Sequence, residues 1–244
     1  MMFKHMDFET ISTCNRVCPT CIRNSHPDKG TIQHWHDTYY LDPSVVYEAI
    51  RQAQGMGFDG TVCLSHYNEP LMDWRISYIA DYIKNTLKVS TVYLHTNGDY
   101  LTKELAEDLD GKLDKIVISL YTKKSERKER AEMFKSLFHK TEVQVITESD
   151  HIATHFSPKF PVAQLAETNR QHVCHEPSIR VIINHRKQYL ACCDDVIGNF
   201  DMGTFPEISI KDFWFGYKRE MMESNLSQEG GRANYPYCLS CPRN

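Results

Sequence analysis

Apolar positions follow two different periods along the first 150 residues of the chain. Short apolar runs alternate with segments in which apolar residues recur every three to four positions. The runs predict strands, and the recurring pattern predicts amphipathic helices. The predicted strands cover residues 6–11, 60–64, 91–95, 115–120 and 142–146.

Predicted helices separate these strands. The first begins at Asp42-Pro43, because aspartate accepts the free N–H groups of a helix start and proline suits the first helical position. We expect Gly55 to end it. The other predicted helices cover residues 76–87, 102–109 and 123–138.

Strands and helices that alternate through short connections imply parallel strands and right-handed crossovers. We therefore expect an α/β fold, a partial (β/α) barrel of about five to six parallel strands. A closed eight-stranded barrel needs about 250 residues by itself, and the whole chain has 244. Functional groups gather at the carboxyl ends of such strands, which selects the loops after Ile11, Leu64, His95 and Leu120.

The pattern changes after residue 150. Residues 151–173 are irregular, residues 178–192 predict a β-hairpin, and residues 210–222 predict a last helix. We expect a main domain over residues 1–160 and a small C-terminal domain over residues 161–244.

Composition and charge narrow the classes of protein. The apolar fraction of 41% and the charged fraction of 25% are globular values. No run approaches the ~18 apolar residues of a membrane span, and the N-terminus has no signal-peptide core. Lys and Arg are scattered, and the densest charged stretch, residues 123–130, also contains Glu. We therefore expect a cytoplasmic protein, with a solvated helix face at 123–130 and no nucleic-acid or membrane partner.

The nine cysteines are unevenly distributed. Three lie within residues 14–21 and five lie after residue 170. Cys63 lies alone inside a predicted strand, where a buried thiol is expected. Clustered cysteines in a chain without an export signal indicate metal binding or catalysis rather than disulfides. We expect two metal-binding regions.

The N-terminal cysteines form a C-x3-C-x2-C pattern directly after the first predicted strand, with ligands Cys14, Cys18 and Cys21. Three thiolates can hold three irons of a [4Fe–4S] cluster and leave the fourth iron open, as a catalytic metal site requires. Unligated thiols are one alternative. Another is a zinc site that takes its fourth ligand from His26, His34 or His36.

The C-terminal cysteines include a C-x2-C pair, Cys238 and Cys241. Folding of the predicted hairpin would bring Cys174 and Cys192 towards this pair. Four thiolates complete either a [4Fe–4S] cluster or a tetrahedral zinc site. Cys193 is adjacent to Cys192, and neighbouring strand residues point to opposite faces, so we assign only Cys192 as a ligand.

The segment from Cys14 to Cys21, CNRVCPTC, resembles the motif of the radical S-adenosylmethionine (SAM) superfamily. The resemblance implies that SAM chelates the fourth iron of the cluster. One electron then cleaves SAM to methionine and a 5′-deoxyadenosyl radical, which abstracts a hydrogen atom from the substrate. It also implies an external one-electron donor such as flavodoxin or ferredoxin. Thr20 stands where the family commonly has an aromatic residue beside the adenine.

Further SAM contacts follow from the same resemblance. The segment SHYNEP after the second strand is similar to the family's Gly-Gly-Glu-Pro segment, which binds the SAM amino group, and here contains Tyr67, Asn68 and Glu69. Glu69 is the expected acceptor of the ammonium group. Asn68 replaces a glycine, whose positive φ asparagine tolerates. Asn97 and Ser119 stand where ribose or carboxylate contacts are expected.

The C-terminal region resembles the twitch domain, a shortened SPASM domain with one auxiliary [4Fe–4S] cluster held by four cysteines. The resemblance rests on Cys192 followed by Asp194-Asp195, an Ile-x-x-Phe-Trp segment at 210–214, and the final C-x2-C pair. It implies two [4Fe–4S] clusters in all. The chain also resembles the 2-deoxy-scyllo-inosamine dehydrogenases of aminoglycoside biosynthesis, through Glu69-Pro70-Leu71, residues 96–102 and the spacing of the C-terminal cysteines, but not over residues 121–170.

Three function classes remain open. The first is a radical SAM oxidoreductase that dehydrogenates a small-molecule alcohol and passes an electron to the auxiliary cluster. Its general base would come from the candidates His66, His151, His155 and Lys159. The second is a maturase that crosslinks, epimerises or forms a thioether in a peptide substrate. The third is a non-enzymatic metal-binding scaffold, which has no use for an open iron.

Overall fold

The computed structural model describes residues 2–18, 21–25, 37–147, 171–239 and 241. Within these residues the strands form one sheet in the order β5-β4-β3-β2-β1-β6-β7. Neighbouring strands are parallel from β5 to β6, and β7 is antiparallel to β6. The strands are β1 His5–Phe8, β2 Thr61–Cys63, β3 Thr91–Thr96, β4 Lys115–Leu120, β5 Glu142–Thr147, β6 Arg180–Ile183 and β7 Tyr189–Leu190.

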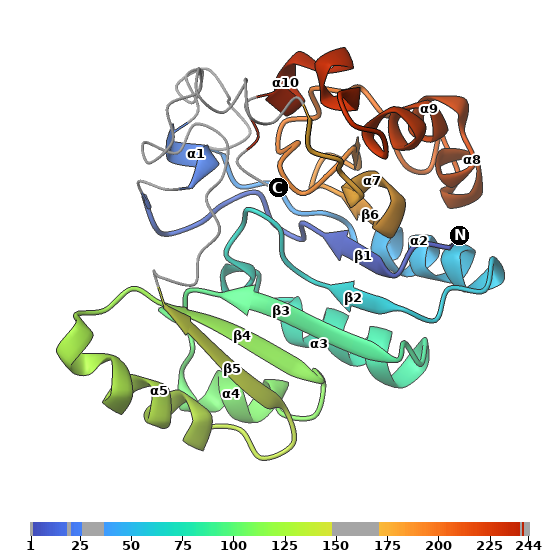
Figure 1. Cartoon of the computed structure of the whole chain (residues 1–244). Coiled ribbons are helices and arrows are strands. Elements are labelled where there is room, and N and C mark those ends of the chain that lie inside the picture. Colours follow the sequence, from blue (N-terminus) through green and yellow to red (C-terminus); the bar gives the residue numbers. More distant parts are fainter. Residues whose placement is uncertain (1, 19–20, 26–36, 148–170, 240, 242–244) are drawn as a thin grey trace.

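The helices α2, α3 and α4 cover the same face of this sheet, and the C-terminal helices α8 and α9 lie on the side of β6 and α2 (Figure 1). The helices are α1 Ile22–Ser25, α2 Pro43–Gly55, α3 Ile76–Asp81, α4 Lys103–Leu109, α5 Arg127–Ser136, α7 Glu176–Ile179, α8 Ile210–Trp214, α9 Tyr217–Leu226 and α10 Pro236–Leu239. Short helical turns are η2 Pro70–Met72, η3 Tyr82–Thr86, η4 Lys124–Glu126 and η6 Gly231–Asn234. None of the described helices is long and apolar enough to cross a membrane.

The predicted α/β class with five to six parallel strands is confirmed. The sixth parallel strand is β6, which comes from the C-terminal part of the chain and pairs with β1. The sheet therefore joins the two regions expected to be separate domains. The expected boundary at 160/161 lies outside the described residues.

The start of α2 forms as the sequence predicts. Asp42 accepts a hydrogen bond from the backbone N–H of Ser44 at 2.8 Å, and Pro43 occupies the first turn. The predicted end is also confirmed, because Gly55 is the last residue of α2. Two residues later, Gly57 has a positive φ of +90°, which glycine adopts readily.

The single helix predicted over residues 210–222 is two helices, α8 and α9. Gly216 separates them with an extended backbone, at φ −72° and ψ 140°. A Cβ on Gly216 would lie 2.5 Å from the backbone oxygen of Asp212. The space therefore fits glycine and no larger residue at this break, which apolar periodicity alone does not reveal.

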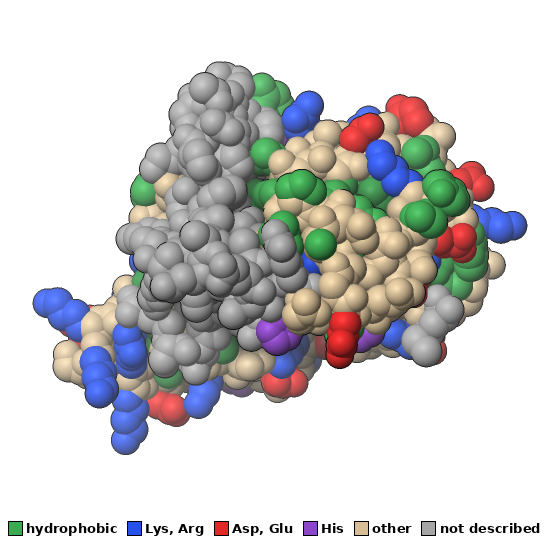
Figure 2. Space-filling model, turned by 45° about the horizontal axis from the view of Figure 1, so that its top comes forward, with side chains coloured by type: hydrophobic (Ala, Val, Ile, Leu, Met, Phe, Trp, Pro, Cys, Tyr) green, Lys and Arg blue, Asp and Glu red, His purple; other side chains and the backbone are tan. Residues whose placement is uncertain are grey.

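Helix α5 presents a charged outer surface. Phe134 is its only buried residue. Lys and Arg side chains gather at the end of the molecule where α5 lies (Figure 2). A helix that buries one side chain keeps the rest in water, as expected for residues 123–130.

Candidate active site

The register of the parallel strands builds a cavity with a polar floor. Asp7, Cys63 and Tyr93 are paired neighbours on β1, β2 and β3, so their side chains share one face of the sheet. This face opens into a cavity of about 530 Å³. Pockets of roughly 300–1,000 Å³ are typical of small-molecule sites. Its wall includes residues at the carboxyl ends of the strands: Ser65, His66, Asn68, His95, Asn97, Ser119 and Tyr121.

The first cysteine set opens into this cavity. Cys14, Cys18 and Cys21 all line it, as the motif predicts for a shared cluster. The loop turns back on itself, since the backbone N–H of Cys21 donates to the oxygen of Cys18 at 3.0 Å. Burial raises the pKa of the Cys21 thiol to about 11, and the neighbouring Cys14 and Cys18 contribute to the shift.

The three thiols that line the cavity fit the donor set of a [4Fe–4S] cluster. No three His, Cys, Asp or Glu side chains of the described ranges are arranged to hold a single metal ion. A [4Fe–4S] cluster binds each thiolate to a different iron, so the three sulfurs stand around it instead of meeting at one point. The zinc alternative with His26, His34 or His36, and the adenine position of Thr20, lie outside the described residues.

Glu69 is buried and ties two loops together. Its Oε1 accepts hydrogen bonds from the Thr96 hydroxyl at 2.6 Å and from the Leu71 N–H at 3.1 Å. Its Oε2 accepts the N–H of Asn97 at 2.8 Å. Burial raises the pKa of this carboxyl, although these hydrogen bonds oppose the rise. Each carboxylate oxygen has two lone-pair sites, so Oε2 keeps one site for a further donor.

Asn68 keeps a negative φ, so the expected glycine-like conformation was wrong. Its side chain orders the loop in another way, because Oδ1 accepts the N–H of His66 at 2.8 Å. The Nδ2 of Asn68 is buried and finds no acceptor among the described residues. This amide group lies on the cavity wall and can donate a hydrogen bond to the carboxylate of a ligand.

Asn97 connects the end of β3 to the cysteine loop. Its Nδ2 donates to Asn15 Oδ1 at 2.8 Å and lies 3.9 Å from the Cys14 sulfur. The next residue, Gly98, has φ +75°, and a Cβ there would lie 2.9 Å from the Phe134 ring. The chain turns at Gly98, and the side chain of Asn97 lies against the cysteine loop.

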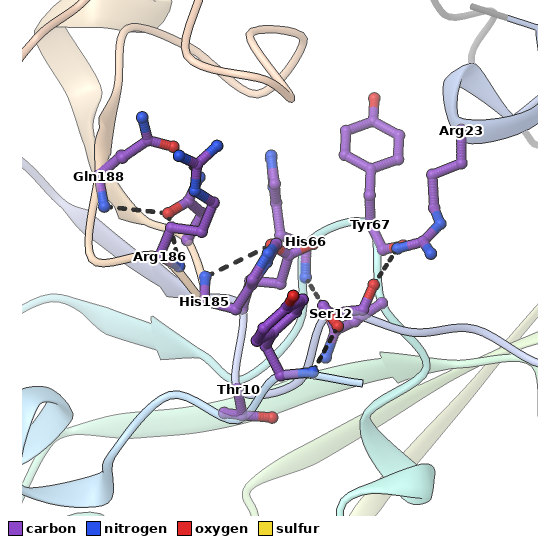
Figure 3. A network of polar contacts seen from close by, with 12 residues as sticks. Thr10, Ser12, Arg23, His66, Tyr67, His185, Arg186 and Gln188 are labelled. Carbon is purple, nitrogen blue, oxygen red and sulfur yellow. Dashed lines mark hydrogen bonds and ion pairs between the residues drawn. The ribbon is translucent and has the colours of Figure 1, made fainter. Parts of the chain in front are cut away.

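A polar network that sequence analysis missed supports these loops. Arg23 contacts the backbone oxygen of Ser12 and donates to that of Tyr67 at 3.3 Å, which joins the cysteine loop to the loop after β2 (Figure 3). Near this network, the buried carboxylate of Glu9 contacts Nδ1 of His185. Arg23 lies two residues after the motif, but no spacing rule marks it.

A family model named Radical SAM superfamily matches residues 8–140, more than half of the chain. The chain belongs to the radical SAM superfamily. Membership implies SAM and a [4Fe–4S] cluster. No curated protein sequence matches the chain.

Solved structures of radical SAM enzymes share the fold. BtrN, a 2-deoxy-scyllo-inosamine dehydrogenase, in complex with AdoMet and 2-DOIA has a TM-score of 0.78 at 20% identity, over 100% of this chain and 94% of BtrN. SuiB of Streptococcus suis bound to the precursor peptide SuiA has a TM-score of 0.61 at 13% identity, over 99% of this chain and 71% of SuiB. The enzyme anSMEcpe with bound AdoMet has a TM-score of 0.60 at 12% identity, over 93% of this chain and 81% of anSMEcpe. At these identities the similarity establishes the fold alone.

The second cysteine set of this radical SAM protein surrounds a smaller cavity. Its lining includes Cys174, Cys192, Cys193, Cys238 and Cys241. All nine cysteines are described, and none forms a disulfide. Burial raises the pKa of the Cys238 thiol to about 12, and the nearby Cys241 and Cys174 contribute. The structure thus brings together the four cysteines expected to hold an auxiliary cluster, with Cys193 beside them.

Cys192 and Cys193 have different surroundings. Cys192 lines only the smaller cavity, whereas Cys193 lines both cavities. The Cys193 thiol also donates to Glu176 Oε2 at 3.6 Å. Both cysteines follow β7 rather than lying within it, and both line the smaller cavity, so the alternation of strand faces expected from the sequence does not separate them.

Tyr67, expected among the SAM contacts, also reaches the second cysteine set. Its hydroxyl donates to Asp194 Oδ1 at 3.0 Å, and the Cys241 thiol lies 3.6 Å from Asp194 Oδ2. Sequence analysis noted Asp194 only as part of the twitch pattern. The contact joins two segments 127 positions apart, which no local pattern could reveal.

Of the candidate bases, only His66 is described. It lines the large cavity, and its buried Nε2 has no hydrogen-bond partner in the described part of the chain. Burial lowers the pKa of His66 below 6.5, which favours the neutral imidazole that a base requires. His151, His155 and Lys159 lie outside the described residues.

Proposed function

We propose that this radical SAM protein is a two-cluster oxidoreductase that oxidises a small-molecule alcohol. Cys14, Cys18 and Cys21 would hold the SAM-binding [4Fe–4S] cluster. Cys174, Cys192, Cys238 and Cys241 would hold an auxiliary [4Fe–4S] cluster of the twitch type. An external protein such as flavodoxin or ferredoxin would supply the first electron.

One observation carries the proposal: the two cysteine sets open into adjoining cavities that share Cys193. Tyr67 and Asp194 form a second connection, at 3.0 Å, between the loop after β2 and the C-terminal cysteines. A substrate in the large cavity would therefore lie close to both sets. Two-electron oxidation of an alcohol needs this proximity. The 5′-deoxyadenosyl radical formed at the first cluster would take the hydrogen atom, and the auxiliary cluster would take the remaining electron.

When bound, SAM and its cluster supply the 5′-deoxyadenosyl radical, and the auxiliary cluster supplies an electron acceptor whose potential the protein can set between about −700 and +450 mV. The residues of the chain do the remaining work. Glu69 and Asn68 present an acceptor and a donor suited to the amino and carboxylate groups of SAM. His66 is the base that accepts the hydroxyl proton of the substrate.

The structural similarity supports a small substrate over a peptide. The fold is more similar to BtrN with bound 2-DOIA, at a TM-score of 0.78, than to SuiB and anSMEcpe with bound peptides, at 0.61 and 0.58. A cavity of about 530 Å³ suits a small polar molecule beside SAM.

Iron analysis and SAM cleavage test the proposal. Anaerobic reconstitution should give about eight irons per chain, from two [4Fe–4S] clusters. Addition of SAM and a reductant should yield 5′-deoxyadenosine. The double variant Cys238→Ala/Cys241→Ala should keep roughly half of the iron. Bound zinc with about four irons would refute the auxiliary cluster, and absence of 5′-deoxyadenosine under all reducing conditions would refute the radical SAM activity.

Single cysteine variants provide matched controls. Cys63→Ser should keep all the iron, because Cys63 is buried beside Ser65 and belongs to neither set. Cys192→Ala should lose auxiliary iron, whereas Cys193→Ala should retain it. Loss of auxiliary iron in Cys193→Ala, with retention in Cys192→Ala, would identify Cys193 as the ligand instead of Cys192.

A further inference from the structure

A buried arginine lines the smaller cavity, which the second cysteine set surrounds. Arg232 belongs to η6 and is only 2% exposed. Its Nη2 donates to the backbone oxygen of Val173 at 3.4 Å, which is long for a hydrogen bond. Its Nε and Nη1 are buried and have no hydrogen-bond acceptor among the described residues. A buried guanidinium that lacks acceptors costs free energy, so its presence at this cavity calls for an explanation.

The acidic side chains of the same cavity are bonded to other groups. Glu176 Oε2 lies 2.7 Å from Arg180 Nε, and Asp194 Oδ1 accepts the hydroxyl of Tyr67 at 3.0 Å. In the described part of the chain, Arg232 forms no ion pair with a carboxylate. The cavity of the cysteines therefore contains a positive charge that still needs an anion.

The backbone that carries Arg232 is closely packed. η6 contacts α9, where a Cβ on Gly231 would lie 1.7 Å from the backbone oxygen of Asn225. Gly230 precedes η6 in the left-handed region, at φ +78°. Two consecutive glycines thus bring η6 against α9 and fix the point from which the arginine reaches the cavity.

Thiolates are the anions that this guanidinium can meet. The four cysteines assigned to the auxiliary cluster line the same cavity. Burial raises the pKa of the Cys238 thiol, and the charge of Arg232 opposes this rise, so the guanidinium lies close enough to act on that sulfur. A [4Fe–4S] cluster with four thiolate ligands is an anion, and its net charge and the hydrogen bonds to its sulfurs help to set its potential. The two unpaired nitrogens therefore fit a cluster at this set.

We propose that Arg232 raises the reduction potential of the auxiliary cluster, with Nε and Nη1 donating to its sulfur atoms. The inference rests on the proposed function, in which this cluster accepts the second electron of the alcohol oxidation. A positive charge beside the cluster stabilises the state that has gained the electron. Arg232 thereby favours electron transfer to the second cysteine set and has no part in binding SAM.

A redox titration of the anaerobically reconstituted holoenzyme, followed by electron paramagnetic resonance, tests the inference. SAM binds the open iron of the first cluster and changes its signal, so the signal that SAM leaves unchanged belongs to the auxiliary cluster. Arg232→Met keeps a long side chain but removes the charge and the donors. It should lower the equilibrium constant for reduction of the auxiliary cluster at least about tenfold, which is a midpoint potential about 59 mV lower. Arg232→Lys keeps the charge and should shift the potential by less than half as much.

Arg219→Met is the matched control. Arg219 is also buried, but it does not line the cavity of the second cysteine set. Its Nη1 donates to the backbone oxygen of Pro177 at 2.9 Å, and its Nη2 lies 2.8 Å from Glu223 Oε2. Because its charge is already paired, this variant should keep the wild-type potential.

An unchanged auxiliary potential in Arg232→Met, or equal shifts in Arg232→Met and Arg232→Lys or in Arg232→Met and Arg219→Met, would overturn the inference. Iron content decides if Arg232→Met does not load the auxiliary cluster. Loading of Arg232→Lys would then support the role of the charge, and loss of auxiliary iron in both variants would overturn it.

The titration needs neither substrate nor SAM cleavage, so its result is separate from that of the proposed function. About eight irons in the wild type with an unchanged potential in Arg232→Met would refute the inference alone. Zinc with about four irons in the wild type would refute the auxiliary cluster and the inference with it.

Discussion

The carboxylate of Glu69 accepts the backbone N–H of Asn97 at 2.8 Å, which fixes the loop after β2 to the end of β3. Thr96 donates to the same carboxylate at 2.6 Å. Asn97 in turn donates to Asn15 in the cysteine loop. One buried side chain therefore holds together the loops that would surround SAM.

Replacement of this carboxylate by an amide should weaken SAM binding. In Glu69→Gln an amide nitrogen replaces one carboxylate oxygen. This nitrogen cannot accept a hydrogen bond, so at least one of the bonds from Leu71, Thr96 and Asn97 is lost. We expect the Kd for SAM to rise about tenfold, with the iron of the first cluster retained. Equilibrium dialysis on the reconstituted protein measures this. Glu142→Gln, an exposed change on β5, should have no effect. Unchanged affinity in Glu69→Gln would contradict the role given to this residue.

Arg23 joins the cysteine loop to the loop after β2 through the backbone oxygens of Ser12 and Tyr67. Arg23→Met keeps a long side chain but removes the donors. We expect faster loss of iron from the first cluster during anaerobic dialysis against a chelator, because the loop is held less firmly. Arg51→Met, which alters an exposed arginine on α2, should lose iron at the wild-type rate. Equal rates in the two variants would show that Arg23 does not support the cluster loop.

The buried pair of Glu9 and His185 should make stability depend on pH. Burial alone would raise the pKa of Glu9, but the hydrogen bond and charge of His185 outweigh it and hold the pKa below 4.5. A depressed folded-state pKa contributes stability above the unfolded-state value, and this contribution is lost as pH falls through the folded-state pKa.

Glu9→Gln should therefore lower the unfolding free energy by roughly 2 kcal/mol near neutral pH. The difference from wild type should shrink as the pH falls below 4.5. Urea unfolding at a series of pH values measures both effects. Glu107→Gln, on the exposed side of α4, is the reference and should show neither. A difference that is constant with pH would mean that Glu9 is not ionised in the folded state.

Two glycines should respond oppositely to alanine. A Cβ at Gly231 would lie 1.7 Å from the backbone oxygen of Asn225, whereas nothing lies within 4 Å of a Cβ at Gly55. Gly231→Ala should destabilise the chain by about 2 kcal/mol or more, because backbone must move. Gly55→Ala, at the end of α2, should stabilise it by about 0.5–1 kcal/mol. Melting temperatures measure both, and a stable Gly231→Ala would show that η6 can shift away from α9.

The sequence by itself determined the local elements and the first cysteine motif. Strand and helix periods depend on residues a few positions apart, so β3, β4 and the capped start of α2 could be predicted. C-x3-C-x2-C is equally local, and the structure places its three thiols on one cavity.

Only the tertiary structure decided which distant residues meet. The pairing of β6 with β1 brings Arg180 to Asp7 across 173 positions, and the chain fold brings Tyr67 to Asp194. The break between α8 and α9 at Gly216 is likewise seen only in the structure. Such contacts arise from sheet register and packing, which follow from the whole chain at once, and no short segment contains that information.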